Sequence, residues 1–356
     1  MNYISAGRSA GGISMAVREI EYVELYARDK QAMADYFASS LGFARVADSV
    51  GADRSSVLLR QGDVQLLVTS GPGTWKFLDQ HGDGVADIAL TCDDVTKTRN
   101  AVEAAGGRLA GTIQGNPIVQ GFGGVSHTLL PDGGGDGPGA RLPGGRTWAA
   151  FPGASTRPSG RIRQLDHVAV CLEGGSLSEY ADYYGDAFGL SRYSSEYVDT
   201  GEQGMDSIVV RSASGRITFT LVAPDPAKSP GQLDAFLDRN GGPGVQHLAF
   251  LVDDIIPAVS ELRGRGVEFL STPSTYYDML AERFADMREE ITGLRAAHVL
   301  ADRDEWGYLL QLFSRSPYER NTLFYELIQR QGSRGFGSAN IRALYEAVER
   351  DRLAAT

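Results

Sequence analysis

The sequence predicts an α+β fold built from four βαβββ modules that form two pseudo-symmetric halves. The main observation is an internal repeat: residues 20–46 resemble residues 165–192, and residues 82–107 resemble residues 242–266. Members of the first pair each predict a short strand, a polar turn and an amphipathic helix that ends at a glycine. Members of the second pair have two aspartates at the predicted helix start and glycine at its end, as helix capping favours. The chain therefore contains four similar units.

The remaining strands of a unit appear as runs of alternating apolar and polar residues. Residues 206–213 and 216–222 predict two antiparallel strands joined by a tight Ser-Gly turn. Together with the strand and helix that open the unit, they complete a βαβββ module. Residues 338–353 predict a final amphipathic helix behind a serine cap, which we expect to dock against the second half.

A change in composition divides the chain. Residues 131–163 are dense in glycine and proline and show no hydrophobic period, which is typical of a linker or surface loop. The expected organisation is a tail over residues 1–19, a first domain over 20–130, a linker over 131–163 and a second domain over 164–356.

Composition excludes several classes of protein. The 356 residues carry 34 Lys and Arg against 45 Asp and Glu, a formal charge of −11, so no general basic field favours nucleic acid. Cys92 and Cys171 lie far apart without paired spacing, which argues against a disulfide scaffold or a thiolate cluster. No stretch approaches the roughly 20 apolar residues of a membrane span, and the N-terminus lacks an apolar targeting segment. We expect a soluble cytoplasmic protein with neither a membrane nor a nucleic-acid partner.

Two of the five histidines occupy matching positions in the repeat. His167 and His247 are each the third residue of a short predicted strand, LDHVAV and VQHLAF. Equivalent positions on pseudo-symmetric strands face each other across a shared cavity, so two neutral imidazoles there converge on one metal ion. The first half has Tyr22 and Asp87 at the same positions and therefore predicts no such pair.

Glu326, in the run TLFYELI, is the candidate for a third ligand. A carboxylate between apolar neighbours needs a partner when it is buried. The alternative is that Glu326 points to solvent, because strand neighbours alternate faces and a polar residue there is ordinary. With the two histidines it forms a two-histidine, one-carboxylate facial triad, which suits non-heme Fe(II) and dioxygen.

Several longer motifs in the second half carry a family resemblance. They are PSTYYD at 273–278, GYLLQLF at 307–313, TLFYELIQR at 322–330 and GFGSANIRALYEAVE at 335–349. With the two histidine strands, they resemble the 4-hydroxyphenylpyruvate dioxygenase family of the vicinal oxygen chelate superfamily. The resemblance runs from about residue 20 to residue 350 and fails only in the Gly/Pro-rich connection.

The resemblance implies an Fe(II) ion held by His167, His247 and Glu326, inside an open barrel-like cup of the second half with the C-terminal helix over the site. It also implies a structural first half without metal, and a possible homo-oligomer. The positions that match the family's substrate contacts are Ser207, Gln232, Gln246, Gln311, Phe313, Phe336 and Asn340. From the residues alone, a solvated strand position is the alternative for each glutamine, and most of all for Gln232. Phe313 and Phe336 are equally compatible with ordinary core.

The family contains two activities on 4-hydroxyphenylpyruvate and O2. One attacks the ring and gives homogentisate, and the other hydroxylates the benzylic carbon and gives 4-hydroxymandelate, a precursor of 4-hydroxyphenylglycine in peptide antibiotics. The ring-attacking enzymes usually carry Pro-x-Asn where this chain has Thr220 and Val222, and Phe where it has Ile341. These three substrate-wall residues resemble the second activity and predict benzylic hydroxylation, although drift within an apolar wall remains an alternative. Two other hypotheses for the function are an extradiol ring-cleaving dioxygenase and a non-catalytic binding protein of the superfamily.

Overall fold

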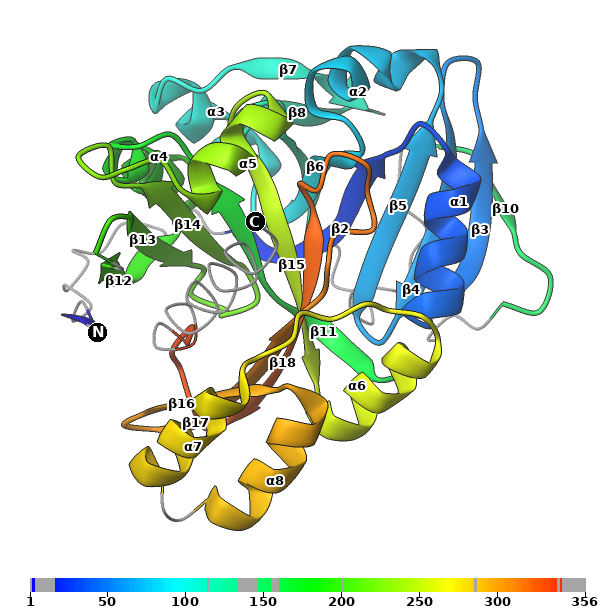
Figure 1. Cartoon of the computed structure of the whole chain (residues 1–356). Helices are drawn as coiled ribbons and strands as arrows, with labels where there is room; N and C mark the ends of the chain where they lie inside the picture. The colour runs from blue at the N-terminus through cyan, green and yellow to red at the C-terminus, as the bar shows by residue number, and fades with distance from the viewer. Residues whose placement is uncertain are drawn as a thin grey trace.

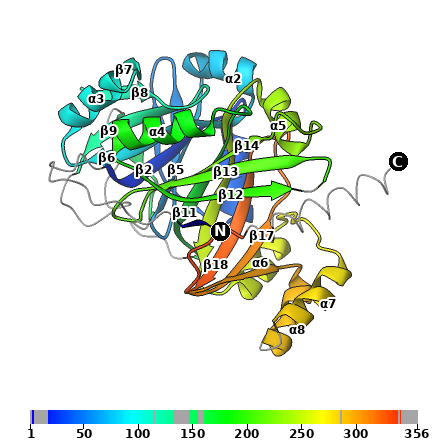
Figure 2. The same ribbon diagram turned by 90° about the vertical axis from the view of Figure 1, so that its left-hand side faces the viewer.

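A computed structural model describes residues 2–3, 17–113, 115–132, 146–154, 160–199, 201–284, 287–337 and 340. Within this part of the chain, the strands form two sheets of nine strands each, one per half (Figures 1 and 2). The predicted C-terminal helix, including Ile341, lies outside the described residues except for Asn340.

The first sheet contains two βαβββ modules side by side. Each module begins with a central strand that pairs in parallel with the last strand of the same module, and the two central strands pair antiparallel with each other. In sheet order the strands are β10 (Trp148–Ala150), β3 (Ala44–Val50), β4 (Ser55–Gln61), β5 (Val64–Ser70), β2 (Val17–Tyr26), β6 (Gly84–Cys92), β9 (Ser126–Pro131), β8 (Asn116–Gln120) and β7 (Leu109–Ile113).

The second sheet repeats this plan, which confirms the four predicted modules. Its central strands are again antiparallel neighbours, and each pairs in parallel with the strand that closes its module. In sheet order the strands are β1 (Asn2–Tyr3), β12 (Ser191–Asp199), β13 (Gly204–Arg211), β14 (Thr218–Pro224), β11 (Ile162–Cys171), β15 (Gly244–Val252), β18 (Phe324–Gln331), β17 (Gly307–Phe313) and β16 (Leu300–Asp304).

The helices join the strands within and between the modules. The described helices are α1 (Lys30–Asp35) with a π-helical continuation (Tyr36–Ser40), a short 3-10 turn (Pro72–Thr74), α2 (Trp75–His81), α3 (Val95–Ala104), α4 (Leu177–Phe188), α5 (Gln232–Asn240), α6 (Ile255–Gly264), α7 (Ser274–Arg283) and α8 (Arg288–Ala297). The predicted aspartate cap is present at α3, where the Asp94 carboxylate accepts from the Lys97 amide at 3.0 Å. Helices α7 and α8 lie together at one end of the second sheet (Figure 1). No described helix has the length and apolar character that a membrane crossing requires.

The two halves share a core. Alternate residues of the central strands, such as Val168, Val170, Leu248 and Phe250, are fully buried in one cluster that also contains apolar residues of the first half. The histidines on the same strands point to the opposite face because strand neighbours alternate sides. The histidine-bearing face of the second sheet is therefore the face turned away from the common core.

The segment expected to be an irregular linker has structure of its own. Within it, β10 pairs antiparallel with β3 at the edge of the first sheet. Just before it, Arg146 donates to the buried Glu24 carboxylate at 2.5 Å, and to the hydroxyl of Thr69 at 3.1 Å. A buried carboxylate needs such a partner, and this requirement anchors the segment to the first half.

Candidate metal centre and cavity

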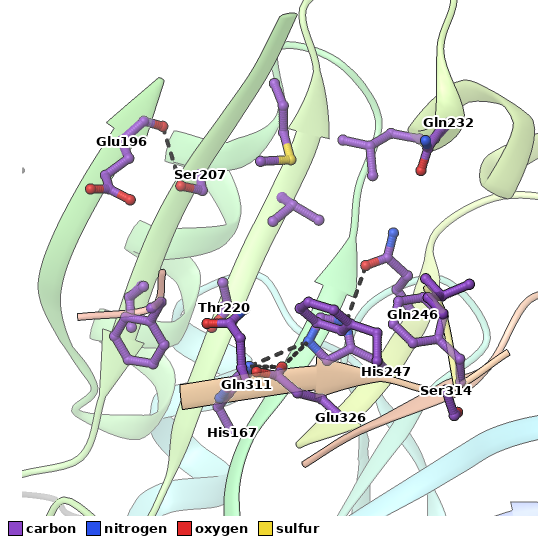
Figure 3. Close-up of a pocket in the computed structure, with 18 of the residues that line it drawn as sticks. His167, Glu196, Ser207, Thr220, Gln232, Gln246, His247, Gln311, Ser314 and Glu326 are labelled. Carbon is purple, nitrogen blue, oxygen red and sulfur yellow. Dashed lines mark hydrogen bonds and ion pairs between the residues drawn. The ribbon is translucent and has the colours of Figure 1, made fainter. Parts of the chain in front are cut away.

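His167, His247 and Glu326 meet at one point although they lie on three different strands. His167 is on β11, His247 on β15 and Glu326 on β18. His167 and Glu326 both lie opposite Ala249 of β15, from its two sides, and His247 is two residues before Ala249 on β15 itself. The Glu326 carboxylate lies 3.3 Å from Nε2 of His167 and 3.2 Å from Nε2 of His247 (Figure 3). All three side chains are nearly buried, with exposures of 5%, 12% and 3%. The solvent-facing alternative for Glu326 is therefore wrong.

The spacing of the three donor atoms fits a metal ion. The two imidazole Nε2 atoms are 3.3 Å apart, so the three atoms form a nearly equilateral triangle. Ligands about 2.1 Å from a metal and at right angles to each other are about 3 Å apart, which is the edge of one octahedral face. Within the described residues, this is the cluster of ligating side chains that could hold a metal ion. Two histidines and one carboxylate on one face leave the opposite face open.

Each metal-facing imidazole is oriented by the residue that precedes it in the sequence. His167 Nδ1 donates to the Asp166 carboxylate at 2.8 Å, and His247 Nδ1 donates to the Gln246 side-chain oxygen at 3.2 Å. With the proton on Nδ1, a deprotonated Nε2 would direct its lone pair to the centre of the triangle.

Two β-bulges make these neighbour contacts possible. The pairing of β11 with β15 shifts between Leu165 and His167, which leaves Asp166 as the extra residue, and again where Gln246 is the extra residue beside His247. An extra residue in one strand re-aims its side chain, so neighbours that normally alternate faces can both serve one site.

Burial opposes charge on all three ligands, and their contacts decide where protons reside. For His167, the carboxylates of Glu326 and Asp166 outweigh burial and raise its pKa to about 9. For His247 burial dominates and lowers its pKa. Burial also disfavours the charged Glu326, but the adjacent His167 outweighs it and the pKa of Glu326 is lowered. The site therefore stabilises a positive charge next to an ionised Glu326, which is the demand that a metal cation meets.

The triad forms part of the wall of a cavity of about 150 Å³. A protein cavity of that size accommodates a single benzene ring. The lining includes eight of the predicted substrate contacts and wall residues: Ser207, Thr220, Val222, Gln232, Gln246, Gln311, Phe313 and Phe336. Ser207 and Gln232 lie at the end of the cavity away from the triad (Figure 3).

Unpartnered polar atoms in this lining indicate a polar ligand. The Thr220 hydroxyl, the Gln232 side-chain nitrogen and the Gln311 side-chain oxygen are buried without a hydrogen-bond partner. Buried polar atoms are almost always paired, so three orphans around one cavity are expected where a bound molecule completes them. Gln232 is the first residue of α5 and not a strand residue, and its side-chain nitrogen is buried in the cavity lining.

One predicted contact is placed elsewhere, and several lining residues were not predicted. The side chain of Asn340 is buried outside the lining and accepts a hydrogen bond from the Tyr276 hydroxyl at 2.9 Å. Phe324, which stacks on His247 with ring centres 5.0 Å apart, was not anticipated. It lies two residues before Glu326 and thus on the same strand face, so the alternation of the strand was the signal that could have revealed it. The further unpredicted lining residues are Ser194, Glu196, Met205, Val209, Leu233, Leu270 and Ser314.

The first half has a different chemistry at the equivalent positions. Tyr22 pairs opposite Ala89, and Asp87 opposite Glu24, as His167 pairs opposite Ala249, and His247 opposite Ala169. Asp87 is buried, and burial together with the Glu24 charge raises its pKa to about 7. The first half thus carries a phenol and a largely neutral carboxyl group where the second half carries two imidazoles.

Comparison with known proteins agrees with the family resemblance of the sequence motifs. Residues 164–312 match the family described as Glyoxalase/Bleomycin resistance protein/Dioxygenase superfamily, and residues 13–130 match Hydroxyphenylpyruvate dioxygenase, HPPD, N-terminal. The fold and the triad thus define a member of the vicinal oxygen chelate superfamily. The 4-hydroxyphenylpyruvate dioxygenase of Aspergillus fumigatus is 30% identical over 93% of this chain and 92% of its own length, and that of Neurospora crassa is 32% identical over 78% and 71%.

These relatives show that the chain belongs to the 4-hydroxyphenylpyruvate dioxygenase family. A solved structure of a mutant of 4-hydroxymandelate synthase from Streptomyces coelicolor is 48% identical, with a TM-score of 0.87, and the match covers 95% of this chain and all of that one. The chain is therefore a dioxygenase of this family, and its relatives include proteins named 4-hydroxyphenylpyruvate dioxygenase and one named 4-hydroxymandelate synthase.

Proposed function

We propose that this protein is an Fe(II)-dependent 4-hydroxymandelate synthase, which converts 4-hydroxyphenylpyruvate and O2 into 4-hydroxymandelate and CO2. The observation that carries the proposal is the cavity wall formed by Thr220 and Val222. Both residues line the cavity from one face of β14, two positions apart. An asparagine at the second position would offer the ring a polar contact, and Val222 removes it. The proposal also draws on the 48% identity to a 4-hydroxymandelate synthase.

The three ligands would hold Fe(II), and the ion would bind the 2-oxo acid as a chelating ligand and activate dioxygen. Two neutral imidazoles and one carboxylate leave the ion one net positive charge. The cavity lining contains no lysine or arginine among the described residues. The substrate carboxylate would therefore find its compensating charge at the bound ion, which would fix that end of the molecule.

The rest of the lining positions the aromatic ring. Phe313 and Phe336 supply apolar surface to the cavity lining. At the end away from the metal, the Ser207 hydroxyl donates to the Glu196 backbone oxygen at 3.2 Å and so presents its lone pairs to a phenol. The free side-chain nitrogen of Gln232 is a donor for the same phenol oxygen. A substrate held by its carboxylate at one end and by its phenol at the other has its benzylic carbon on the metal side of the ring.

The second candidate is the dioxygenase that gives homogentisate, because the curated relatives at 30–32% identity bear that name. Product identity distinguishes the two. Protein loaded with Fe(II) is incubated with 4-hydroxyphenylpyruvate and O2, and the product is identified by chromatography against standards and by proton NMR, since the two products are isomers. A benzylic CH–OH signal supports the proposal, and a trisubstituted ring with an intact CH2 contradicts it.

The wall residues are tested by reversion. Val222→Asn restores an amide without disturbing the backbone, and we expect it to raise the share of homogentisate. Thr220→Pro is the less direct change, because Thr220 lies in an interior strand paired on both sides and proline removes a backbone donor there. An unchanged product ratio in Val222→Asn and in the double variant would exclude these two positions as the cause.

A further inference from the structure

Arg330 contacts the residue that orients the metal ligand. It lies on β18, four residues after Glu326 and so on the same strand face. Its Nε and Nη2 donate to the two oxygens of the Asp166 carboxylate, each at 2.7 Å, in the two-pronged geometry that arginine favours. Asp166 in turn accepts the Nδ1 proton of His167 at 2.8 Å.

The same guanidinium contacts the chain that follows β18. Its remaining nitrogen, Nη1, donates to the backbone oxygen of Gly335 at 2.6 Å and of Ser333 at 3.3 Å. The guanidinium carbon lies 5.0 Å from the centre of the Phe336 ring. We call residues 333–337 the C-terminal strap.

The strap lies against the metal site. The Phe336 ring meets the His167 ring edge to face, with centres 5.4 Å apart, and Phe336 also lines the cavity. At Gly337, an added Cβ would lie 2.1 Å from the side-chain oxygen of Gln311, so the backbone of the strap contacts a second cavity residue directly. The strap is therefore one wall of the substrate cavity.

A second anchor holds the strap from the other side. One oxygen of Asp304 accepts from the Ser333 hydroxyl at 2.8 Å and from the backbone amides of Arg334 and Gly335 at 2.7 and 2.8 Å. Asp304 has no contact with the triad among the described hydrogen bonds. Of the two anchors, Arg330 is thus the one that also reaches a metal ligand.

We propose that Arg330 is a positioning residue that couples the orientation of His167, through Asp166, to the docking of the C-terminal strap over the substrate cavity. The inference rests on the proposed function in that the triad holds Fe(II). A bound metal ion would fix the His167 ring, and the hydrogen bond from Nδ1 would then fix the Asp166 carboxylate. That carboxylate holds the Arg330 guanidinium in the position from which it donates to the strap. By reciprocity, a docked strap favours metal binding to the same extent that metal binding favours docking.

The test compares wild type with Arg330→Lys, since lysine keeps the charge but loses the fork that serves two partners. Two quantities are measured: the Fe(II) dissociation constant by anaerobic titration, and hydrogen exchange at the amides of Arg334 and Gly335 with and without Fe(II). The matched control is Arg146→Lys, which alters a buried arginine–carboxylate pair of the first half.

In wild type and in Arg146→Lys, we expect Fe(II) to slow exchange in the strap. In Arg330→Lys, we expect Fe(II) binding to weaken by roughly 10- to 100-fold, the usual cost of losing a partner behind a ligand, and the slowing to disappear at saturating Fe(II). Wild-type affinity or preserved slowing in Arg330→Lys would overturn the inference while leaving the proposed function intact. Failure of wild type to bind Fe(II) would overturn the proposed function itself.

A second variant keeps the test independent of the stability of Arg330→Lys. Asp304→Asn weakens the other anchor and leaves the Arg330–Asp166–His167 contacts in place. Coupling predicts faster exchange at Gly335 and weaker Fe(II) binding, although Asp304 does not touch the triad. Faster exchange with unchanged Fe(II) affinity would show that docking and metal binding are independent.

Discussion

Asp87 offers a sharp test of how the two halves differ. It occupies the position in the first half that His247 occupies in the second, and it is only 5% exposed. Its carboxyl accepts a hydrogen bond from the Ser126 hydroxyl at 2.7 Å. The perturbation is Asp87→Asn, which keeps the size of the side chain and removes its ionisation.

Burial, together with the Glu24 charge, raises the pKa of Asp87 from 3.8 to about 7. Between these two values the folded protein keeps a proton that the unfolded chain has released. The stability of the wild type therefore falls as the pH rises through this window, by at most about 1.4 kcal/mol per pH unit, and levels off above pH 7. Between pH 5.5 and pH 8 the loss sums to about 2 kcal/mol. Asp87→Asn has no such loss.

The assay is urea unfolding of wild type and Asp87→Asn at pH 5.5 and pH 8. We expect the free energy of unfolding of the variant, relative to wild type, to increase by about 2 kcal/mol between the two pH values. Asp35→Asn, which alters an exposed carboxylate of α1 in the same half, serves as control and should show no such change. A difference between Asp87→Asn and wild type that does not vary with pH would refute the reasoning, because it would mean that Asp87 is ionised throughout.

Three further predictions follow from the site and the strap. His247→Ala removes one of the three candidate ligands. We expect it to weaken Fe(II) binding by more than the roughly 10- to 100-fold that loss of a residue behind a ligand costs, measured as iron retained per chain after desalting. Iron retention equal to wild type would contradict the triad. Gly337→Ala places a Cβ against Gln311 at a φ of +72°, so KM for 4-hydroxyphenylpyruvate should rise, and Fe(II) binding should weaken with it because strap docking and metal binding are coupled; an unchanged KM would show that the strap adjusts freely. Arg146→Gln leaves the buried Glu24 without its charged partner and should lower the free energy of unfolding by about 3 kcal/mol without loss of iron binding. A loss of iron binding would mean that the first half is not independent of the site.

The duplicated fold explains why a single site results from four similar modules. Both sheets carry bulges at equivalent places beside their central strands. In the second half the bulge residues orient two imidazoles. In the first half Tyr22 and Asp87 stand in place of those two histidines, and Arg146 supplies a positive charge to Glu24. Each half thus pairs a buried carboxylate with a cation, an arginine in the first half and, on our proposal, a metal ion in the second.

The sequence alone predicted the modules and the three candidate metal ligands, because both predictions depend on local, repeated signals. Strand and helix periods, capping residues and the recurrence of histidine at one strand position are all readable within short windows. Glu326 followed once those histidines were paired across the repeat. The cavity-lining residues that were missed, such as Phe324, lay two positions from residues that were found, and the alternation of the strand would have included them.

Only the tertiary structure decided which distant residues support those ligands. Arg330 and Asp166 are 164 positions apart, and Arg146 and Glu24 are 122 positions apart, so no local pattern connects either pair. The bulges at Asp166 and Gln246 depend on the register between two strands, which a single strand does not encode. The physical reason is the same in each case: a buried charge or ring nitrogen takes its partner from whatever the packed fold brings within about 3 Å, and that proximity is a property of the whole chain.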